Sequence, residues 1–203
     1  MLATALAPAP SGSLRIASDL EAARRVKAAD TDAVLVRRTL PPEVAEAAAA
    51  RARFGPVLQL RYAFALAQLD ADAERGLFAP LGDGPLAVQL RRDAARLARL
   101  WGELTGRERA VATLKLVDGD ECTKLHADYV DLRVLCTYCG PGTWVARDSA
   151  LDDPPLVQAS AGDLVFLKGR SWPGARGAKH RSPALQGTGE RRLVLRVDAL
   201  QLR

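Results

Sequence analysis

The chain has 203 residues, of which 48% are hydrophobic and 26% are charged, and its formal net charge is +5. This apolar content suffices for one buried core, and the arginines behind the positive charge are scattered, without the basic ribbon typical of nucleic-acid binding. No run of about eighteen apolar residues is present that could span a membrane. We therefore expect a globular protein whose partners include neither a membrane nor a nucleic acid.

The cysteines and the first residues bear on the compartment. Cys122, Cys136 and Cys139 are an odd number of cysteines in a mid-sized chain, which argues against a disulfide framework. The N-terminal segment lacks a basic region and reaches Pro8 and Pro10 too early for a signal peptide. We expect a cytoplasmic protein with reduced thiols.

The chain divides by composition into a tail and one domain. Residues 1–13 alternate Ala and Pro with Ser and Gly, which predicts a disordered tail because such a segment buries little apolar surface. Residues 14–203 are expected to form a single domain. Within it, residues 14–106 are predicted to be mainly helical and residues 107–203 to form a β core.

Five elements are expected in the mainly helical part. A capping box from Ser18 to Glu21 and the sequence Pro41-Pro42-Glu43 mark two helix starts, and Gly106 ends a long segment with an apolar residue at every third or fourth position. The expected helices cover residues 18–29, 41–52, 57–73 and 86–104, and a short strand is expected at residues 34–36.

After Gly106 the sequence changes to short β-prone runs that are separated by Gly, Pro and Asp. Helices followed by many short strands favour an α+β protein whose sheet closes into a small barrel or sandwich, with the helices packed outside it. The expected strands cover residues 111–117, 133–138, 156–159, 164–167 and 193–197.

Two histidines are present in the whole chain, His126 and His180. His126 precedes Asp128 by two residues, so the two side chains can point to the same side at a strand end, while His180 comes from a distant strand. Two imidazoles and one carboxylate form the facial triad that holds non-haem Fe(II) and leaves coordination positions open. We predict that these three residues are metal ligands and the catalytic centre.

The surroundings of these ligands resemble the double-stranded β-helix core of the 2-oxoglutarate- and Fe(II)-dependent dioxygenases. His126-Ala127-Asp128 is followed by a strand from Arg133 to Tyr138, a Gly142-Thr143 corner and an Ala161-Gly162-Asp163 turn before an apolar strand. The pattern Arg-x-Leu-Cys-Thr-Tyr-x-Gly-Pro-Gly-Thr, joined to His180-Arg-Ser-Pro, also resembles an uncharacterised bacterial domain family that covers most of the chain. The resemblance implies an α+β fold with a jelly-roll or cupin-like core in the C-terminal half and N-terminal helices packed outside.

The resemblance also implies Fe(II) and 2-oxoglutarate as cofactors and the hydroxylation of a small-molecule or protein substrate. An arginine on the last strand would bind the distal carboxylate of 2-oxoglutarate. Arg191 shares a strand face with the apolar Leu193, so we expect Arg191 to point inward, with Arg192 as the alternative. Tyr138 and Arg133 are predicted to help bind the co-substrate, although Arg133 could instead orient Asp128 or form a salt bridge outside the barrel.

Two alternative hypotheses assign different functions to the same residues. Cys122, Cys136 and Cys139 with one histidine could bind zinc tetrahedrally in a non-catalytic, zinc-handling protein. Cys136 and Cys139 are three residues apart and would lie on opposite faces of a regular strand, which makes a shared metal awkward. A cupin-like enzyme could also use the triad without 2-oxoglutarate.

Overall fold

The computed structural model describes residues 13–200, except for the side chains of Ser13, Ala71 and Asp72. The tail predicted for residues 1–13 lies outside the described residues, apart from Ser13, which begins a strand. The strands are β1 (Ser13–Ala17), β2 (Thr31–Val36), β3 (Leu58–Ala65), β4 (Arg109–Val117), β5 (Leu132–Cys139), β6 (Trp144–Ala146), β7 (Leu156–Gln158), β8 (Leu164–Lys168), β9 (His180–Arg181) and β10 (Arg192–Ala199).

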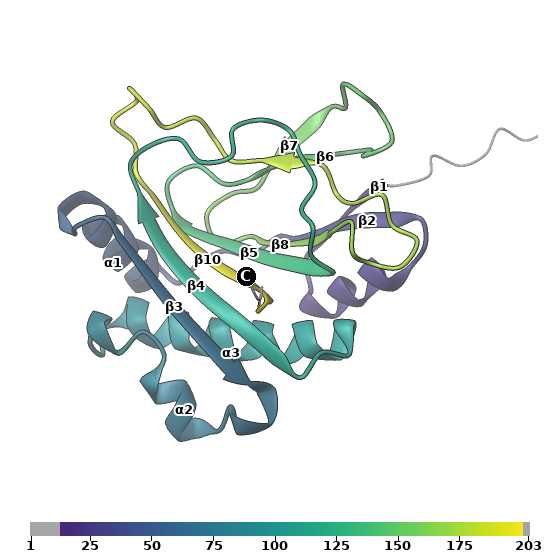
Figure 1. The fold of residues 1–203 in the computed structure, drawn as a ribbon. Coiled ribbons are helices and arrows are strands. Elements are labelled where there is room, and N and C mark those ends of the chain that lie inside the picture. Colours follow the sequence, from purple (N-terminus) through teal and green to yellow (C-terminus); the bar gives the residue numbers. More distant parts are fainter. Residues whose placement is uncertain (1–12, 201–203) are drawn as a thin grey trace, which may run out of the picture.

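Two sheets pack face to face. Within the described residues, a seven-stranded sheet has the order β1-β2-β8-β5-β10-β4-β3, and a three-stranded sheet has the order β7-β6-β9. The large sheet is antiparallel except for the β1–β2 pair. The small sheet lies over one face of the large sheet, and the longer helices lie under the other face (Figure 1).

Helices cover the apolar face of the large sheet. They are η1 (Leu20–Lys27), α1 (Pro42–Phe54), η2 (Leu66–Gln68), α2 (Ala71–Gly76), η3 (Ala79–Leu81) and α3 (Pro85–Thr105). The main core lies between α1, α3 and this face, and a smaller apolar cluster lies between the two sheets. The fold is therefore the expected α+β double-stranded β-helix with helices packed outside it.

Helix α3 is the element that the sequence pattern predicts best. Its apolar residues, including Leu90, Ala94 and Trp101, are buried against the sheet, as their spacing requires. The Trp101 indole N–H donates to the Leu132 carbonyl at 2.8 Å, which ties the helix to β5. Gly106 ends the helix at a φ of 70°, and the prediction of this helix and its end is confirmed.

The helix predicted for residues 57–73 is wrong, because residues 58–65 form the edge strand β3. Leu60 and Tyr62 pack against the helical core, while Arg61 between them is exposed on the other face. This alternation has the period of a strand. Together with β1 and β2, β3 means that the mainly helical part of the chain supplies three strands of the large sheet.

The first predicted helix also differs in detail. The segment forms the 3-10 helix η1, and Asp19, not Ser18, caps it by accepting a hydrogen bond from the Ala22 amide at 2.9 Å. Glu21 does not close a capping box, since its carboxylate pairs with Arg24. The remaining predicted elements lie within a few residues of their predicted bounds, namely α1, β2, β4, β5, β7, β8 and β10, whereas no bounds were predicted for β6 and β9.

A buried carboxylate joins α3 to the sheet. Asp93 is 3% exposed and accepts hydrogen bonds from Arg38 at 2.8 and 2.9 Å, Gln89 at 3.0 Å and the Tyr138 hydroxyl at 2.5 Å. Burial, with the charges of Cys136 and Asp93 next, raises the pKa of Tyr138 well above its usual value, so the phenol stays protonated and donates. Removing Asp93 would leave a partly buried guanidinium and a buried phenol without their shared acceptor.

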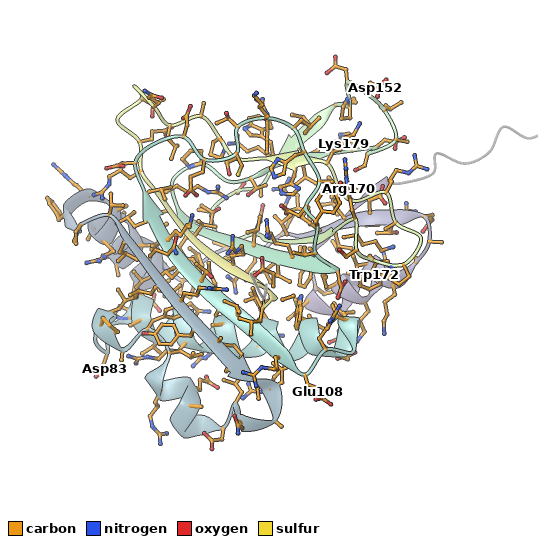
Figure 2. The ribbon with its side chains drawn as sticks, viewed as in Figure 1. Asp83, Glu108, Asp152, Arg170, Trp172 and Lys179 are labelled. Carbon is orange, nitrogen blue, oxygen red and sulfur yellow. The ribbon has the colours of Figure 1, made fainter. Side chains whose placement is uncertain are left out.

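We expect Asp93→Ala to lower the free energy of unfolding by about 3–5 kcal/mol, measured by urea denaturation at neutral pH. Asp83→Ala is the matched control, because Asp83 precedes the same helix but lies at the surface (Figure 2) with 91% of its side chain exposed. This control should change stability by less than about 1 kcal/mol. Equal effects of the two substitutions would contradict the role of Asp93.

Candidate functional site

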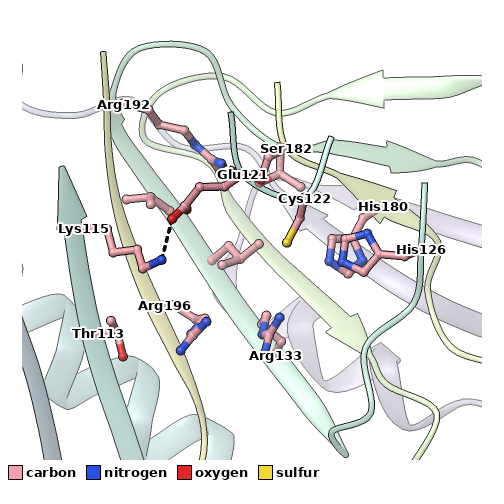
Figure 3. Close-up of a pocket in the computed structure, with 13 residues that line it drawn as sticks. Thr113, Lys115, Glu121, Cys122, His126, Arg133, His180, Ser182, Arg192 and Arg196 are labelled. Atoms are coloured by element: carbon pink, nitrogen blue, oxygen red, sulfur yellow. Dashed lines mark hydrogen bonds and ion pairs between the residues drawn. The ribbon is translucent and has the colours of Figure 1, made fainter. Parts of the chain in front are cut away.

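The structure brings His126, Asp128 and His180 together. The Nε2 atom of His180 lies 3.2 Å from Asp128 Oδ2, and the Nε2 atom of His126 lies 3.6 Å from Asp128 Oδ1. One ligand atom from each of the three residues lies within 4.8 Å of the others. Figure 3 shows the two imidazoles side by side at one end of a pocket. This spacing allows all three to bind one metal ion.

Backbone pairing places the two imidazoles. His126 lies in the loop between β4 and β5, and its amide and carbonyl form an antiparallel bridge with those of His180, at 3.0 and 2.8 Å. Nδ1 of His126 lies 2.8 Å from the Lys124 carbonyl, and Nδ1 of His180 lies 2.9 Å from the Ala178 carbonyl. A carbonyl only accepts, so each Nδ1 donates and each Nε2 keeps a lone pair for a metal.

Asp128 is held as a carboxylate by its neighbours. Burial would raise its pKa, but the close approach of His180 Nε2 at 3.2 Å and the charge of Arg133 outweigh burial and lower the pKa to about 2. Arg133 lies 2.6 Å from Asp128 and 2.8 Å from Asp198, so it bridges two carboxylates. An ionised carboxylate between two neutral imidazoles is a ligand set suited to a divalent metal.

A cavity of about 300 Å³ adjoins the histidines. Its floor is the polar face of the large sheet, and its wall includes β9 with the loops beside it, as Figure 3 shows. Thr113 and Lys115 of β4 also line it, and Lys115 pairs with Glu121 at 2.6 Å. The cavity thus joins the triad to a set of cationic and hydroxyl side chains.

The guanidinium of Arg192 is buried in this cavity at 4% exposure. It donates to the hydroxyls of Thr143 at 2.6 Å, Ser182 at 3.2 Å and Thr137 at 3.3 Å. Across residues 13–200 no carboxylate lies within ion-pair distance of Arg192. Burial lowers its pKa to about 10, against a smaller effect of Glu121, so the group remains cationic near neutral pH.

The expectation that Arg191 and Tyr138 bind a co-substrate is wrong. The Arg191 guanidinium donates to the carbonyls of Ala52 and Gly55 at 2.6 and 2.8 Å, at the end of α1. The Tyr138 hydroxyl donates to Asp93 under the large sheet. Both side chains lie on the helix-covered side, away from the cavity.

Arg191 was predicted to face the cavity because the apolar face of β10 was taken as the face that points into the barrel. Leu193, Leu195 and Val197 belong to the core under the helices, whereas Arg192 and Val194 line the cavity. The strand alternates as predicted, but its apolar face meets the helices, and its polar face meets the cavity. Arginines at alternate positions of the last strand were the signal that could have identified Arg192.

The three cysteines do not form a metal site. Cys122 lines the cavity, whereas Cys136 is buried on the helix side, where its Sγ lies 3.2 Å from an Arg38 nitrogen. Burial raises the pKa of the Cys136 thiol to about 12, which disfavours the thiolate that zinc requires. Among the described residues, His126, Asp128 and His180 are the one group of three or more potential ligands that converges. The tetrahedral cysteine site is therefore a wrong prediction.

Comparison with known proteins places the chain in a family. Residues 17–198 match the family described as "Protein of unknown function (DUF1826)", so the chain belongs to that family. No curated protein matches the chain. Within the described residues, no helix has both the length and the apolar content needed to cross a membrane.

Solved structures share the fold at low identity. The dioxygenase for auxin oxidation from rice is 17% identical with a TM-score of 0.56, over 93% of this chain and 84% of that one. A Pseudomonas putida prolyl-4-hydroxylase is 17% identical with a TM-score of 0.51, over 90% and 99%. The Arabidopsis thaliana dioxygenase for auxin oxidation 1, in a binary complex with 2-oxoglutarate, is 13% identical with a TM-score of 0.51, over 94% and 93%.

We expect the metal-free protein to bind one Co(II) ion, measured by its visible absorption, and Asp128→Ala or His180→Ala to abolish this binding. Arg133→Gln should weaken it by about 10–100-fold, because Arg133 orients a ligand without binding the metal itself. Cys122→Ser is the control, since Cys122 lines the cavity outside the converging ligand set. Loss of Co(II) binding in this control alone would contradict the assigned ligands.

Proposed function

We propose that this member of the DUF1826 family is an Fe(II)- and 2-oxoglutarate-dependent dioxygenase that hydroxylates a C–H bond of its substrate. Two neutral imidazoles and a carboxylate, His126, His180 and Asp128, suit Fe(II) and leave coordination positions for a co-substrate and dioxygen. The fold shared with solved dioxygenases supports the proposal at the level of architecture.

The buried, unpaired guanidinium of Arg192 is the observation that carries the proposal. Burying a charge without a counter-ion costs several kcal/mol, yet this chain surrounds Arg192 with the neutral hydroxyls of Thr137, Thr143 and Ser182. A carboxylate at this position would accept from the guanidinium fork and from a threonine hydroxyl. Arg192 lines the same cavity as His126 and His180, so a single dicarboxylate can reach both Arg192 and a metal held by the histidines.

Each residue has a defined part in this reaction. Bound Fe(II) would activate dioxygen, which is the oxidant: one oxygen atom would enter 2-oxoglutarate as it loses CO2 to form succinate, and the other would be inserted into the C–H bond of the substrate. His126 and His180 hold the metal through Nε2, and Arg133 keeps Asp128 ionised and oriented. Arg192 and Thr143 fix the far carboxylate, which orients the keto acid.

Neither of the two alternative hypotheses, a zinc-handling protein or a cupin-like enzyme, explains why the Arg192 guanidinium is buried without a carboxylate partner among the described residues. A zinc-handling protein needs only the metal ligands, and its cysteine version fails because Cys136 and Cys122 lie on opposite sides of the large sheet. A cupin-like enzyme without 2-oxoglutarate would likewise leave the buried guanidinium without a counter-ion. The co-substrate supplies the missing negative charge.

Anaerobic titration of metal-free protein with Fe(II) and 2-oxoglutarate should produce the visible charge-transfer band of a chelated keto acid. His126→Ala should not produce the band, because one ligand of the triad is removed. Absence of the band in the parent protein, with zinc retained stoichiometrically through purification, would contradict the proposal and favour metal handling.

Arg192→Met should weaken 2-oxoglutarate binding by about 10–100-fold, the loss of a charge-assisted hydrogen bond worth about 1.5–3 kcal/mol. Fe(II) binding should be unchanged, since Arg192 contacts hydroxyls and no ligand of the triad. Arg191→Met is the matched control and should keep the co-substrate affinity of the parent, because Arg191 faces α1. Titration of the charge-transfer band measures both, and a reversed order of effects would restore Arg191 as the anchor.

A further inference from the structure

Three polar residues form a row across the edge of the large sheet, apart from Arg192. Arg61 of β3 pairs in register with Thr113 of β4, and Thr113 pairs with Arg196 of β10. Directly opposed residues on neighbouring antiparallel strands have Cβ atoms about 5 Å apart and point to the same face. Thr113 and Arg196 line the cavity, and exposed Arg61 extends the row beyond it.

The row contains polar atoms that the protein does not satisfy. Thr113 Oγ1 and Arg196 Nε are buried and have no hydrogen-bond partner within residues 13–200. Arg196 Nε lies 3.3 Å from Asp198 Oδ2, but that oxygen already accepts from Arg133 at 2.9 Å. Arg61 has no ion pair or hydrogen bond with any described residue. Because native proteins rarely leave buried polar atoms unsatisfied, two adjacent ones in a cavity wall point to a ligand.

The net charge of the cavity indicates that this ligand is an anion. Lys115 is paired with Glu121, as the dashed line in Figure 3 shows, and Arg133 is paired with Asp128 and Asp198. With a divalent metal and a dianionic co-substrate bound, their charges cancel; Arg192 and Arg196 then contribute two positive charges, and the second carboxylate beside Arg133 offsets one of them. Arg196, with only a shared carboxylate, then remains as the excess cation.

We propose that Arg61, Thr113 and Arg196, the edge row, bind a carboxylate of the primary substrate, so that the substrate is a small carboxylic acid. The substrate role rests on the proposed function. A guanidinium fork beside one hydroxyl matches the two coplanar oxygens of a carboxylate, whereas a phosphate group has a third oxygen to satisfy. A cavity of about 300 Å³ is at the lower end for ligand pockets, which favours a small molecule.

The edge row can be tested without metal or co-substrate. Acetate is the probe and acetamide is its neutral counterpart, and saturation-transfer-difference NMR measures their weak binding to the metal-free Arg192→Met protein, in which the other anion site is removed. We expect saturable acetate binding and none of acetamide. In the same background, Thr113→Val and Arg196→Gln should each weaken acetate binding at least tenfold.

Two controls separate binding from folding and from general charge effects. Thr113→Val should keep or raise the melting temperature, because the hydroxyl that it removes has no partner in the described structure. Arg53→Gln makes the same charge change as Arg196→Gln on the exposed surface of α1 and should leave acetate binding unchanged.

The outcomes separate this proposal from the proposed function. Acetate binding that is lost on Thr113→Val and Arg196→Gln supports the edge row, whether or not the charge-transfer band forms in the parent protein. Absence of acetate binding, or binding insensitive to both substitutions, overturns the edge row even when the band is present. Inorganic phosphate that binds more tightly than acetate overturns the carboxylate assignment.

Discussion

The cost of placing charge inside the protein governs the arrangement of this molecule. One face of the large sheet is apolar and packs on α1 and α3, while the opposite face carries Arg133, Arg192 and Arg196 toward a cavity. Each cation that is withdrawn from solvent on this face must meet a carboxylate, a hydroxyl or a ligand. Arg133 meets two carboxylates of the chain, Arg192 meets only hydroxyls, and Arg196 shares one carboxylate. Full compensation by carboxylates marks Arg133 as the structural cation, and incomplete compensation marks Arg192 and Arg196 as the two that we assign to ligands.

The convergence of His126, Asp128 and His180 could be predicted from the sequence because metal-ligand chemistry limits the choices severely. With two histidines in the chain, and one of them two residues from an aspartate, few other ligand sets can be built. The elements with strong periodicity were predicted for a similar reason, since α3 repeats its apolar pattern along its 21 residues and buries these side chains against the sheet. Local pattern alone sufficed in both cases.

Prediction of Arg192 as the proposed co-substrate anchor, and of strand β3, required information about tertiary packing. Alternation along β10 separates Arg191 from Arg192, but only the position of the helices tells which face borders the cavity. The assumption that the apolar face of a strand points into the barrel fails for this sheet. Its apolar face packs against the helices, and its polar face lines the cavity. In β3 the alternation of Leu60, Arg61 and Tyr62 was present. Short helices follow the strand directly, so the sequence pattern did not indicate where the strand ends.

The backbone bridge between His126 and His180 bears on how the protein would acquire the metal that we propose. Both imidazoles are positioned by main-chain hydrogen bonds and by carbonyls at Nδ1, none of which depends on an ion. The chain could therefore fold first and load the proposed metal afterwards. Affinities of such nitrogen and oxygen sites rise along the first-row metals from Mn²⁺ to Cu²⁺, so a preformed centre does not by itself select iron. Correct metallation then depends on which ions the cell makes available, and mismetallation by a tighter-binding ion is the corresponding risk.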